Sequence, residues 1–206
     1  MDGLECKTFF RVSRSVPAGL LETIRSEKAT MLLAAWRSEA RNRIETNDEA
    51  YRMLSRPPVP VVIAGGSIGH FGRVIVVARR EDLDAPQELD IDVAADVAAR
   101  ISLHHPVLFV AASVGFTPAP FTARKIHPQP IEMSDPIKWV RDNAKPDDLV
   151  VIPGLDTANE ALNRVPTLSA RAFLVAIGAH GAPAPAHEAH THGLVVGRSL
   201  TEAEAT

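Results

Sequence analysis

The stretch that decides the fold reads Asp148-Leu-Val-Val-Ile-Pro153, then a polar segment, then Arg171-Ala-Phe-Leu-Val-Ala-Ile177. Both ends are continuous apolar runs bounded by charged residues, proline or glycine, which is typical of strands buried on both faces. The polar segment between them is predicted to form a helix over Asn159–Arg164. A buried strand, a helix and a second buried strand in succession predict a parallel β-layer covered by helices.

The same order of elements occurs earlier in the chain. Residues 16–66 are interpreted as helix, strand, helix, strand, and residues 133–178 repeat that order. In the earlier copy the predicted strands are Ala29–Trp36 and Pro60–Ala64, and the polar helix between them ends near Leu54. We interpret this as one supersecondary unit that recurs, with its first copy cut short, because internal repeats decide the fold before local patterns do.

Five strands are predicted in the second part of the chain. They are Phe71–Ala78, Pro106–Ala112, a weak strand at Ala123–His127, Asp148–Ile152 and Arg171–Ile177. A helix over Asp90–Ile101 carries an apolar stripe, and its Asp96 can pair with Arg100 four residues on. Thr117–Phe121 is interpreted as a proline-broken link. Strands alternating with helices predict the α/β class, with a doubly wound parallel sheet.

These patterns divide the chain into three parts. Residues 1–66 form a partial unit, in which Cys6–Val12 is a further candidate strand, and residues 71–178 form a complete unit. The glycine-rich segment Gly65–Gly72 is interpreted as the linker between them. Residues 179–206 are expected to be a mostly disordered tail rich in His, Ala and Pro, with Leu194–Val196 as an apolar segment that could dock.

Composition limits the classes of function. The 206 residues are 46% hydrophobic and 23% charged, which is ordinary for a globular protein with a core. The net charge of -3 provides no basic field, so we expect no nucleic-acid partner. A single cysteine, Cys6, cannot form an internal disulfide and fits a reducing compartment. No apolar run approaches the roughly 20 residues that cross a bilayer, and the first residues resemble no secretory signal, so a cytoplasmic location is expected.

The segments around the first two strands resemble the second half of a universal stress protein domain. Gly19–Trp36 takes the place of the helix and fourth strand of that family, and Leu54–Ile63 that of its last strand, which begins with Pro and Val. Asp147–Gly154 matches the fourth strand again. The resemblance implies a universal stress protein-like fold of the adenine nucleotide alpha hydrolase-like group, with one partial and one complete copy and strand order 3-2-1-4-5. Tandem domains of this divergent kind resemble the cytosolic C-terminal region of bacterial cation/proton antiporters.

Nucleotide-binding members of that family carry a glycine loop after the fourth strand, whose backbone N–H groups cradle phosphates. Neither copy here has the loop: no glycine follows Ala35 before Thr46, and Gly154 is followed by two acidic residues and no second glycine. Because the loop is missing from both copies, we expect no bound nucleotide cofactor of the kind that the resemblance implies. Arg37, Arg79 and Gly154 remain weak candidates for binding another ligand, because they follow strand ends, where open α/β sheets bind ligands.

Each of these candidates also has a structural interpretation. Arg37 can lie in a solvated loop, and Arg79 and Arg80 can be neutralised by the acidic residues that follow them. The tail histidines His187, His190 and His192 are spaced so that they could hold a metal, but we interpret them as part of a soluble tail and expect no metal site. No nucleophile with a partnered base is apparent, so we expect no enzymatic activity.

The resemblance favours a non-catalytic cytosolic regulatory domain of a monovalent cation/proton antiporter, acting through dimerisation or ligand binding. Its partners would be an upstream membrane transporter domain of the same chain and a second copy, joined through Pro60–Ala64 or Ala170–Ile177. The alternative is a free-standing cytoplasmic universal stress protein that binds adenine nucleotides.

Overall fold

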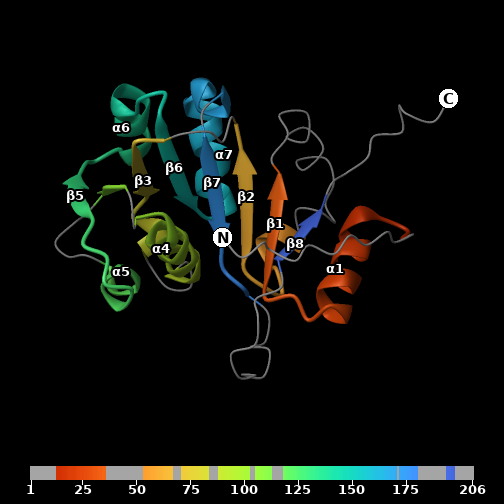
Figure 1. Ribbon diagram of the computed structural model, residues 1–206. Helices are drawn as coiled ribbons and strands as arrows, with labels where there is room; N and C mark the ends of the chain where they lie inside the picture. Colours follow the sequence, from red (N-terminus) through yellow and green to blue (C-terminus); the bar gives the residue numbers. More distant parts are fainter. Residues whose placement is uncertain are drawn as a thin grey trace.

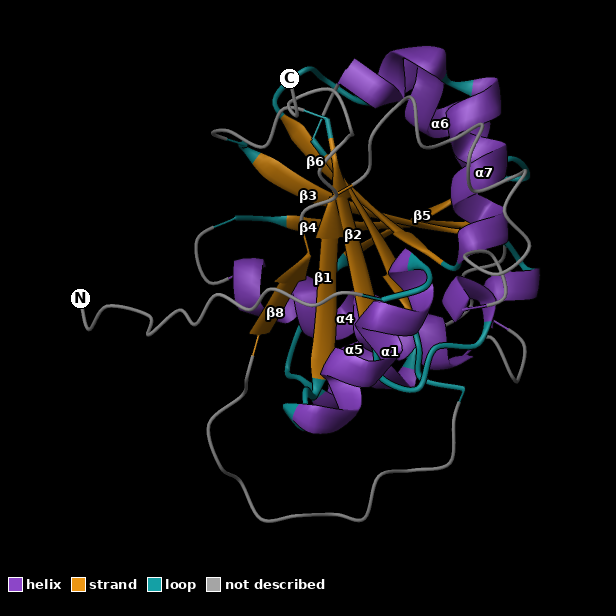
Figure 2. Cartoon of the chain, turned by 90° about the vertical axis from the view of Figure 1, so that its right-hand side faces the viewer, coloured by secondary structure: helices purple, strands orange, loops and turns teal. Residues whose placement is uncertain are grey.

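The computed structural model describes residues 13–35, 53–66, 71–83, 88–102, 105–112, 118–170, 172–180 and 194–197. Its strands form one eight-stranded sheet in the order β5-β4-β3-β6-β7-β2-β1-β8, with helices on both faces (Figures 1 and 2). The α/β class is therefore confirmed, and the sheet is parallel except at one pair of neighbours, β2 and β7.

Residues 71–178 build a five-stranded parallel part of this sheet. Counted from β3, its strand order is 3-2-1-4-5, because β3 lies between β4 and β6. The five strands are β3 (Arg73–Ala78), β4 (Val107–Ala111), β5 (Gln129–Glu132), β6 (Asp148–Pro153) and β7 (Phe173–Ile177). Every residue of β4, β6 and β7 is buried, which explains why these segments, apart from Asp148 at the start of β6, are continuous apolar runs in the sequence.

Four helices cover the two faces of this part. They are α4 (Glu88–Ser102), α5 (Ala119–Ala123), α6 (Pro136–Asn143) and α7 (Leu155–Arg164). Ile91 of α4 and Phe121 of α5 pack on one face, together with Phe109. Ile137 of α6 and Leu162 of α7 pack on the other face. Helices on both faces of a parallel sheet define a doubly wound arrangement.

The first part of the chain adds a helix and two strands to the same sheet. These are α1 (Val16–Ser26), β1 (Met31–Ala35) and β2 (Val61–Gly65). The Ser15 side chain accepts a hydrogen bond from the Ala18 N–H at 3.3 Å and caps α1, and Pro17 follows in the first turn, where proline is tolerated. Ile24 of α1 packs into the core on the face that α6 and α7 cover. β1 and β2 are parallel neighbours.

The antiparallel ladder between β2 and β7 joins the two parts, and we call it the central seam. Its register is centred on the pair Ile63 and Val175. Gly65 lies opposite Phe173, and a Cβ atom at Gly65 would stand 2.1 Å from the Phe173 ring. Glycine at this position lets the aromatic ring lie directly on the neighbouring backbone.

The three strands on one side of the central seam match the three strands nearest the seam on its other side. Outward from the seam, β2 is followed by β1 and β8, and β7 is followed by β6 and β3. β8 (Leu194–Gly197) runs parallel to β1, with Leu194 beside Met31, as β3 runs parallel to β6, with Val74 beside Leu149. β8 thus stands beside β1 in the position that β3 has beside β6, although it comes last in the sequence.

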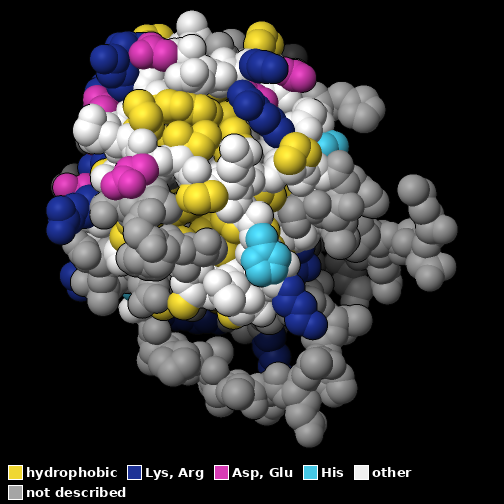
Figure 3. Space-filling model, turned by 90° about the vertical axis from the view of Figure 1, so that its left-hand side faces the viewer, with side chains coloured by type: hydrophobic (Ala, Val, Ile, Leu, Met, Phe, Trp, Pro, Cys, Tyr) yellow, Lys and Arg dark blue, Asp and Glu magenta, His cyan; other side chains and the backbone are white. Residues whose placement is uncertain are grey.

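The other edge of the sheet is β5. On this side of the molecule apolar side chains gather in a patch among charged ones (Figure 3). Pro130 and Met133 are exposed here, and Ile131 is half-buried. The Met133 N–H donates to the Ala111 carbonyl at 3.0 Å, so the alternation along the strand turns Pro130 away from β4. A proline with its missing N–H on the free side protects the edge against further pairing.

Two local predictions were wrong. The link expected at Thr117–Phe121 overlaps the start of the one-turn helix α5 (Ala119–Ala123), whose second residue is proline. The weak strand expected at Ala123–His127 lies later, at Gln129–Glu132, because α5 runs to Ala123 and Lys125 then turns with a positive φ of 58°. Within the tail that was expected to be mostly disordered, Leu194–Gly197 forms β8.

Other predictions fall outside the described residues. They include the candidate strand Cys6–Val12 and half of the linker, residues 67–70, so the division into two units stays a prediction. Among the residues that the structure describes, no helix combines the length and the apolar character needed to cross a membrane.

Candidate functional site

The candidate site lies at the carboxyl ends of β3 and β6. After β3 the chain adds β4 and then β5 on one side of β3, and it returns to add β6 on the other side of β3. The direction in which strands are added therefore reverses between β3 and β6. In open α/β sheets ligands bind in the crevice at such a switch point. Arg79 follows β3, and Gly154 follows β6, so two of the residues singled out in the sequence belong to this one end of the sheet.

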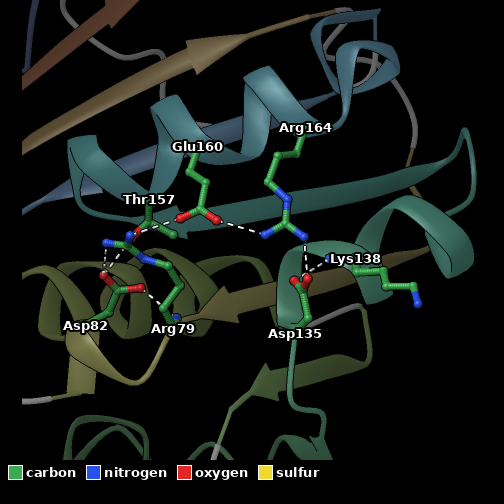
Figure 4. Close-up of polar contacts among 7 residues, drawn as sticks. All are labelled: Arg79, Asp82, Asp135, Lys138, Thr157, Glu160 and Arg164. Atoms are coloured by element: carbon green, nitrogen blue, oxygen red, sulfur yellow. Dashed lines mark hydrogen bonds and ion pairs between the residues drawn. The ribbon is translucent and has the colours of Figure 1, made fainter.

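Asp82 is the centre of the polar contacts here (Figure 4). It lies in the short 3-10 helix η1 (Glu81–Leu83) and is only 3% exposed. Its carboxylate accepts the Thr157 hydroxyl at 2.6 Å and the Arg79 backbone N–H at 2.6 Å, and the Arg79 guanidinium lies 3.4 Å away. Thr157 is fully buried in the first turn of α7. Asp82 therefore ties the end of β3 to α7.

Ion pairs continue from Arg79 along α7 to α6. The Arg79 guanidinium donates to Glu160 at 3.0 Å, and Arg164, four residues on, donates to the same carboxylate at 2.8 Å. Arg164 also contacts Asp135, whose side chain accepts the Lys138 N–H at 2.9 Å and caps α6 (Figure 4). The charges alternate from Asp82 to Asp135, so each arginine lies between two carboxylates. We call this chain of contacts the ion-pair network.

A second buried carboxylate, Asp90, lies in the first turn of α4 and is 7% exposed. It accepts the Gly178 N–H at 2.6 Å, and His180 Nε2 lies 3.7 Å away. Gly154 has a φ of +77°, and a Cβ atom there would stand 2.9 Å from Asp90 Oδ2. The Gly154 N–H donates to the Ala176 carbonyl at 2.8 Å, so it is not free to bind a phosphate.

Burial governs the electrostatics of the two carboxylates. It raises the pKa of Asp82, although hydrogen bonds from Thr157 and Arg79 oppose the shift. Burial also raises the pKa of Asp90, which the Gly178 N–H opposes and the negative charge of Asp82 reinforces. Asp135 is different, because its hydrogen bond with Arg164 lowers its pKa. Negative charge at this end of the sheet disfavours an anionic ligand.

The pairing of Arg79 with an acidic residue that follows it is confirmed, with Asp82 as that residue. Arg37 lies outside the described residues, as do the tail histidines. Sequence reasoning did not identify Thr157 or Asp90 as members of the site. The signal available for Asp90 was its place in the first turn of a helix, which is equally typical of a solvated acid.

The polar side chains of this site contact one another, which bears on catalysis and metal binding. The Thr157 hydroxyl already donates to Asp82 and is buried, so it is not positioned to attack a substrate. Among the described residues, no three His, Cys, Asp or Glu side chains come together as metal ligands would. Compared with known proteins, the sequence matches no family model and no curated protein.

Proposed function

We propose that this chain is a non-catalytic regulatory module with a universal stress protein-like fold, and that it acts as the cytosolic domain of a monovalent cation/proton antiporter. One observation carries the non-catalytic part of the proposal. The switch point where a sheet of this order would hold a nucleotide is filled by the ion-pair network and by Asp90. A module built in this way transmits contacts and does not turn over a substrate.

The strand order supports the universal stress protein-like part of the proposal. The order 3-2-1-4-5 from β3 to β7 is the order that the resemblance implies for a complete unit. β1, β2 and the preceding α1 match β6, β7 and α6 on the other side of the central seam. This match favours a partial copy and a complete copy of one unit within the chain.

The pairing at the central seam changes how a homodimer would form. The two segments expected to join a second copy, Pro60–Ala64 and Ala170–Ile177, contain β2 and β7, which pair with each other inside one chain. Neither strand is a free edge, so a homodimer of the proposed module uses another surface. In this proposal the seam replaces a contact between two chains.

An exchange assay tests the antiporter part. Inverted membrane vesicles are prepared with the full reading frame that encodes the chain and with a version that stops before residue 1. Cation-dependent proton release is followed with a pH-sensitive dye. A regulatory domain predicts exchange in both, with an altered dependence on pH or cation concentration after truncation. A reading frame without membrane-spanning helices, or exchange that truncation leaves unchanged, contradicts the proposal.

The second candidate is a free-standing adenine-nucleotide-binding stress protein. The glycine with positive φ at the start of α7 is the observation that favours it. Calorimetric titration of the chain with ATP, AMP and cyclic dinucleotides separates the two candidates. The regulatory module predicts no heat of binding at micromolar concentrations, because acidic side chains and a paired Gly154 N–H occupy the phosphate position. Saturable binding that Gly154→Val abolishes would favour the second candidate.

A further inference from the structure

We infer that the outer edge of β1 is a strand-acceptor site for a short apolar peptide in parallel orientation, and that the chain's own segment Leu194–Gly197 occupies it as a displaceable ligand. The partner that fits this site is an extended apolar segment of the same chemistry as Leu-Val-Val-Gly. The inference does not depend on the antiporter proposal, because it concerns the edge of the sheet and not the membrane.

The outer side of β1 carries backbone groups with which a further strand can pair. The Leu32 N–H donates to the Pro60 carbonyl of the chain next to β2 at 2.9 Å, so Leu32 and Ala34 turn their backbone groups toward β2. Met31, Leu33 and Ala35 then turn theirs to the opposite side. None of these three residues is a proline, so each offers both a donor and an acceptor to a further strand.

The two sides of the sheet differ in their ability to accept a further strand. Both strands of the central seam lie inside the sheet, and neither can accept another strand. β5 forms one outer edge, where Pro130 has its missing N–H on the free side. The β1 side is therefore the edge suited to main-chain pairing with a peptide, the mode in which an extended segment adds to a sheet.

β8 is held to the sheet by a short backbone ladder. It pairs with β1 through the four residue pairs from Met31 and Leu194 to Ala34 and Gly197, and within the described part of the chain no strand pairs with its other side. Across the sheet, β8 lies three strand spacings, about 14 Å, from β7. In the sequence 16 residues (178–193) separate the two strands, and a stretch of that number can extend much further than this distance, so β8 stays attached to the chain when it leaves β1. A tethered four-residue ladder keeps the site filled through its high effective concentration and still lets it open.

β8 and β3 occupy corresponding positions in the two parts of the sheet. β3 is a fully integrated strand with neighbours on both sides and a buried interior from Val74 to Ala78. β8 stands beside β1 in the same parallel sense as β3 beside β6, but among the residues that the structure describes only its β1 side is paired. The position beside β1 thus corresponds to that of an integral strand, and it is occupied by Leu194–Gly197, a segment distant from β1 in the sequence.

The register supplies a matched pair of variants. In the parallel ladder Leu33 lies beside Val196, so the residues that turn their backbone groups toward β1 are Val195 and Gly197. Val195→Pro removes a donor that faces β1, whereas Val196→Pro removes one that faces away. The same residue type is changed to proline at adjacent positions, and only the first change should release β8.

The experiment uses the full chain of 206 residues and a fluorescent peptide that copies residues 191–200, followed by fluorescence anisotropy. We expect the peptide to bind the Val195→Pro chain saturably, and to bind the wild-type and Val196→Pro chains at least about 10-fold more weakly, because their own strand competes. A peptide that itself carries proline at the position of Val195 should not bind. The result expected in circular dichroism is that both variants retain a cooperative melt.

Three results would overturn the inference. Equal peptide binding to the two proline variants would mean that register does not decide access to β1. Absence of binding to a folded Val195→Pro chain would mean that the edge accepts no strand in trans. Unfolding by Val195→Pro alone would mean that β8 is an integral strand and not a displaceable ligand. A negative result here leaves the exchange assay unaffected, so the two proposals fail separately.

Discussion

Replacing Thr157 by valine tests whether Asp82 organises the candidate site. The two side chains have the same shape, so Thr157→Val leaves no cavity but removes the hydroxyl that donates to Asp82 at 2.6 Å. Both residues are buried, at 0% and 3% exposure, so water does not replace the lost donor. A hydrogen bond to a charged group contributes about 1.5–3 kcal/mol, and we expect the free energy of unfolding at neutral pH to fall by that amount.

The loss should be visible in both common assays. For a chain of this size, each kcal/mol lowers Tm by about 2–4 °C, so Thr157→Val should melt roughly 3–12 °C below the wild type. Urea denaturation followed by circular dichroism gives the free energy itself, with an unchanged m value. The matched control is Thr122→Val, which changes an exposed threonine in α5 and should stay within about 0.5 kcal/mol.

The pH dependence of this loss separates the hydrogen bond from simple packing. Burial raises the pKa of Asp82, and the Thr157 hydroxyl favours its charged form. As the pH falls and Asp82 is protonated, the lost interaction becomes an ordinary neutral hydrogen bond of about 0.5–1.5 kcal/mol, so the difference between variant and wild type should shrink. A difference below 0.5 kcal/mol at neutral pH, or one that does not change with pH, would refute the assignment of Asp82 as the charged centre of the network.

Three further predictions concern other parts of the fold. Burial raises the pKa of Asp90 above its unfolded value, so its protonated form contributes stability that is present below the unfolded value near 3.8 and lost as the pH rises through the folded value. Asp90→Asn still accepts the Gly178 N–H, and in a pH series of urea melts it should gain stability relative to the wild type as the pH rises through that window; a constant difference would contradict the raised pKa. Gly65→Ala forces a Cβ atom to within 2.1 Å of the Phe173 ring and should lower the free energy of unfolding by about 1–3 kcal/mol. Phe173→Leu should recover part of that loss in a double-mutant cycle, whereas additive losses would argue against the central seam. Asp148→Ala leaves Arg73 and the Lys145 N–H without the carboxylate that they contact at 2.6–2.8 Å, and it should lower the free energy of unfolding by about 3 kcal/mol in thermal and urea melts. The control Asp142→Ala removes an exposed ion pair with Arg141 and should leave the melts unchanged. Equal effects of the two variants would contradict the role of burial.

The parallel strands were predictable because burial on both faces leaves a direct trace in the sequence. Within the predicted strands Asp148–Ile152 and Arg171–Ile177, every residue after the first is apolar, and β6 and β7 lie within a residue or two of these ranges. β5 left no such trace, because most of its residues are exposed and one is a proline. β8 is only four residues long and pairs with a strand near the opposite end of the chain, so no local pattern could reveal its partner.

The candidate site was predictable only in part, for a related reason. Arg79 and Gly154 could be placed because they follow strands directly, and strand ends are readable from the sequence. The burial of Asp82 and Asp90 was not readable, because both acids lie in short polar stretches that are equally compatible with a solvated surface. Their burial depends on contacts with Thr157 and Gly178, which the chain contributes some 75 to 88 residues later.

The central seam also sets the order in which this chain can mature on the ribosome. β2 is synthesised well before β7, the strand that covers its open side and places Val175 opposite Ile63. Until β7 has been made, the apolar strands β1 and β2 present an unpaired edge, which is a hazard for aggregation. Pairing across such sequence separations is slow, so β1 and β2 should depend on chaperones during translation and acquire their native sheet only after β7 has been synthesised.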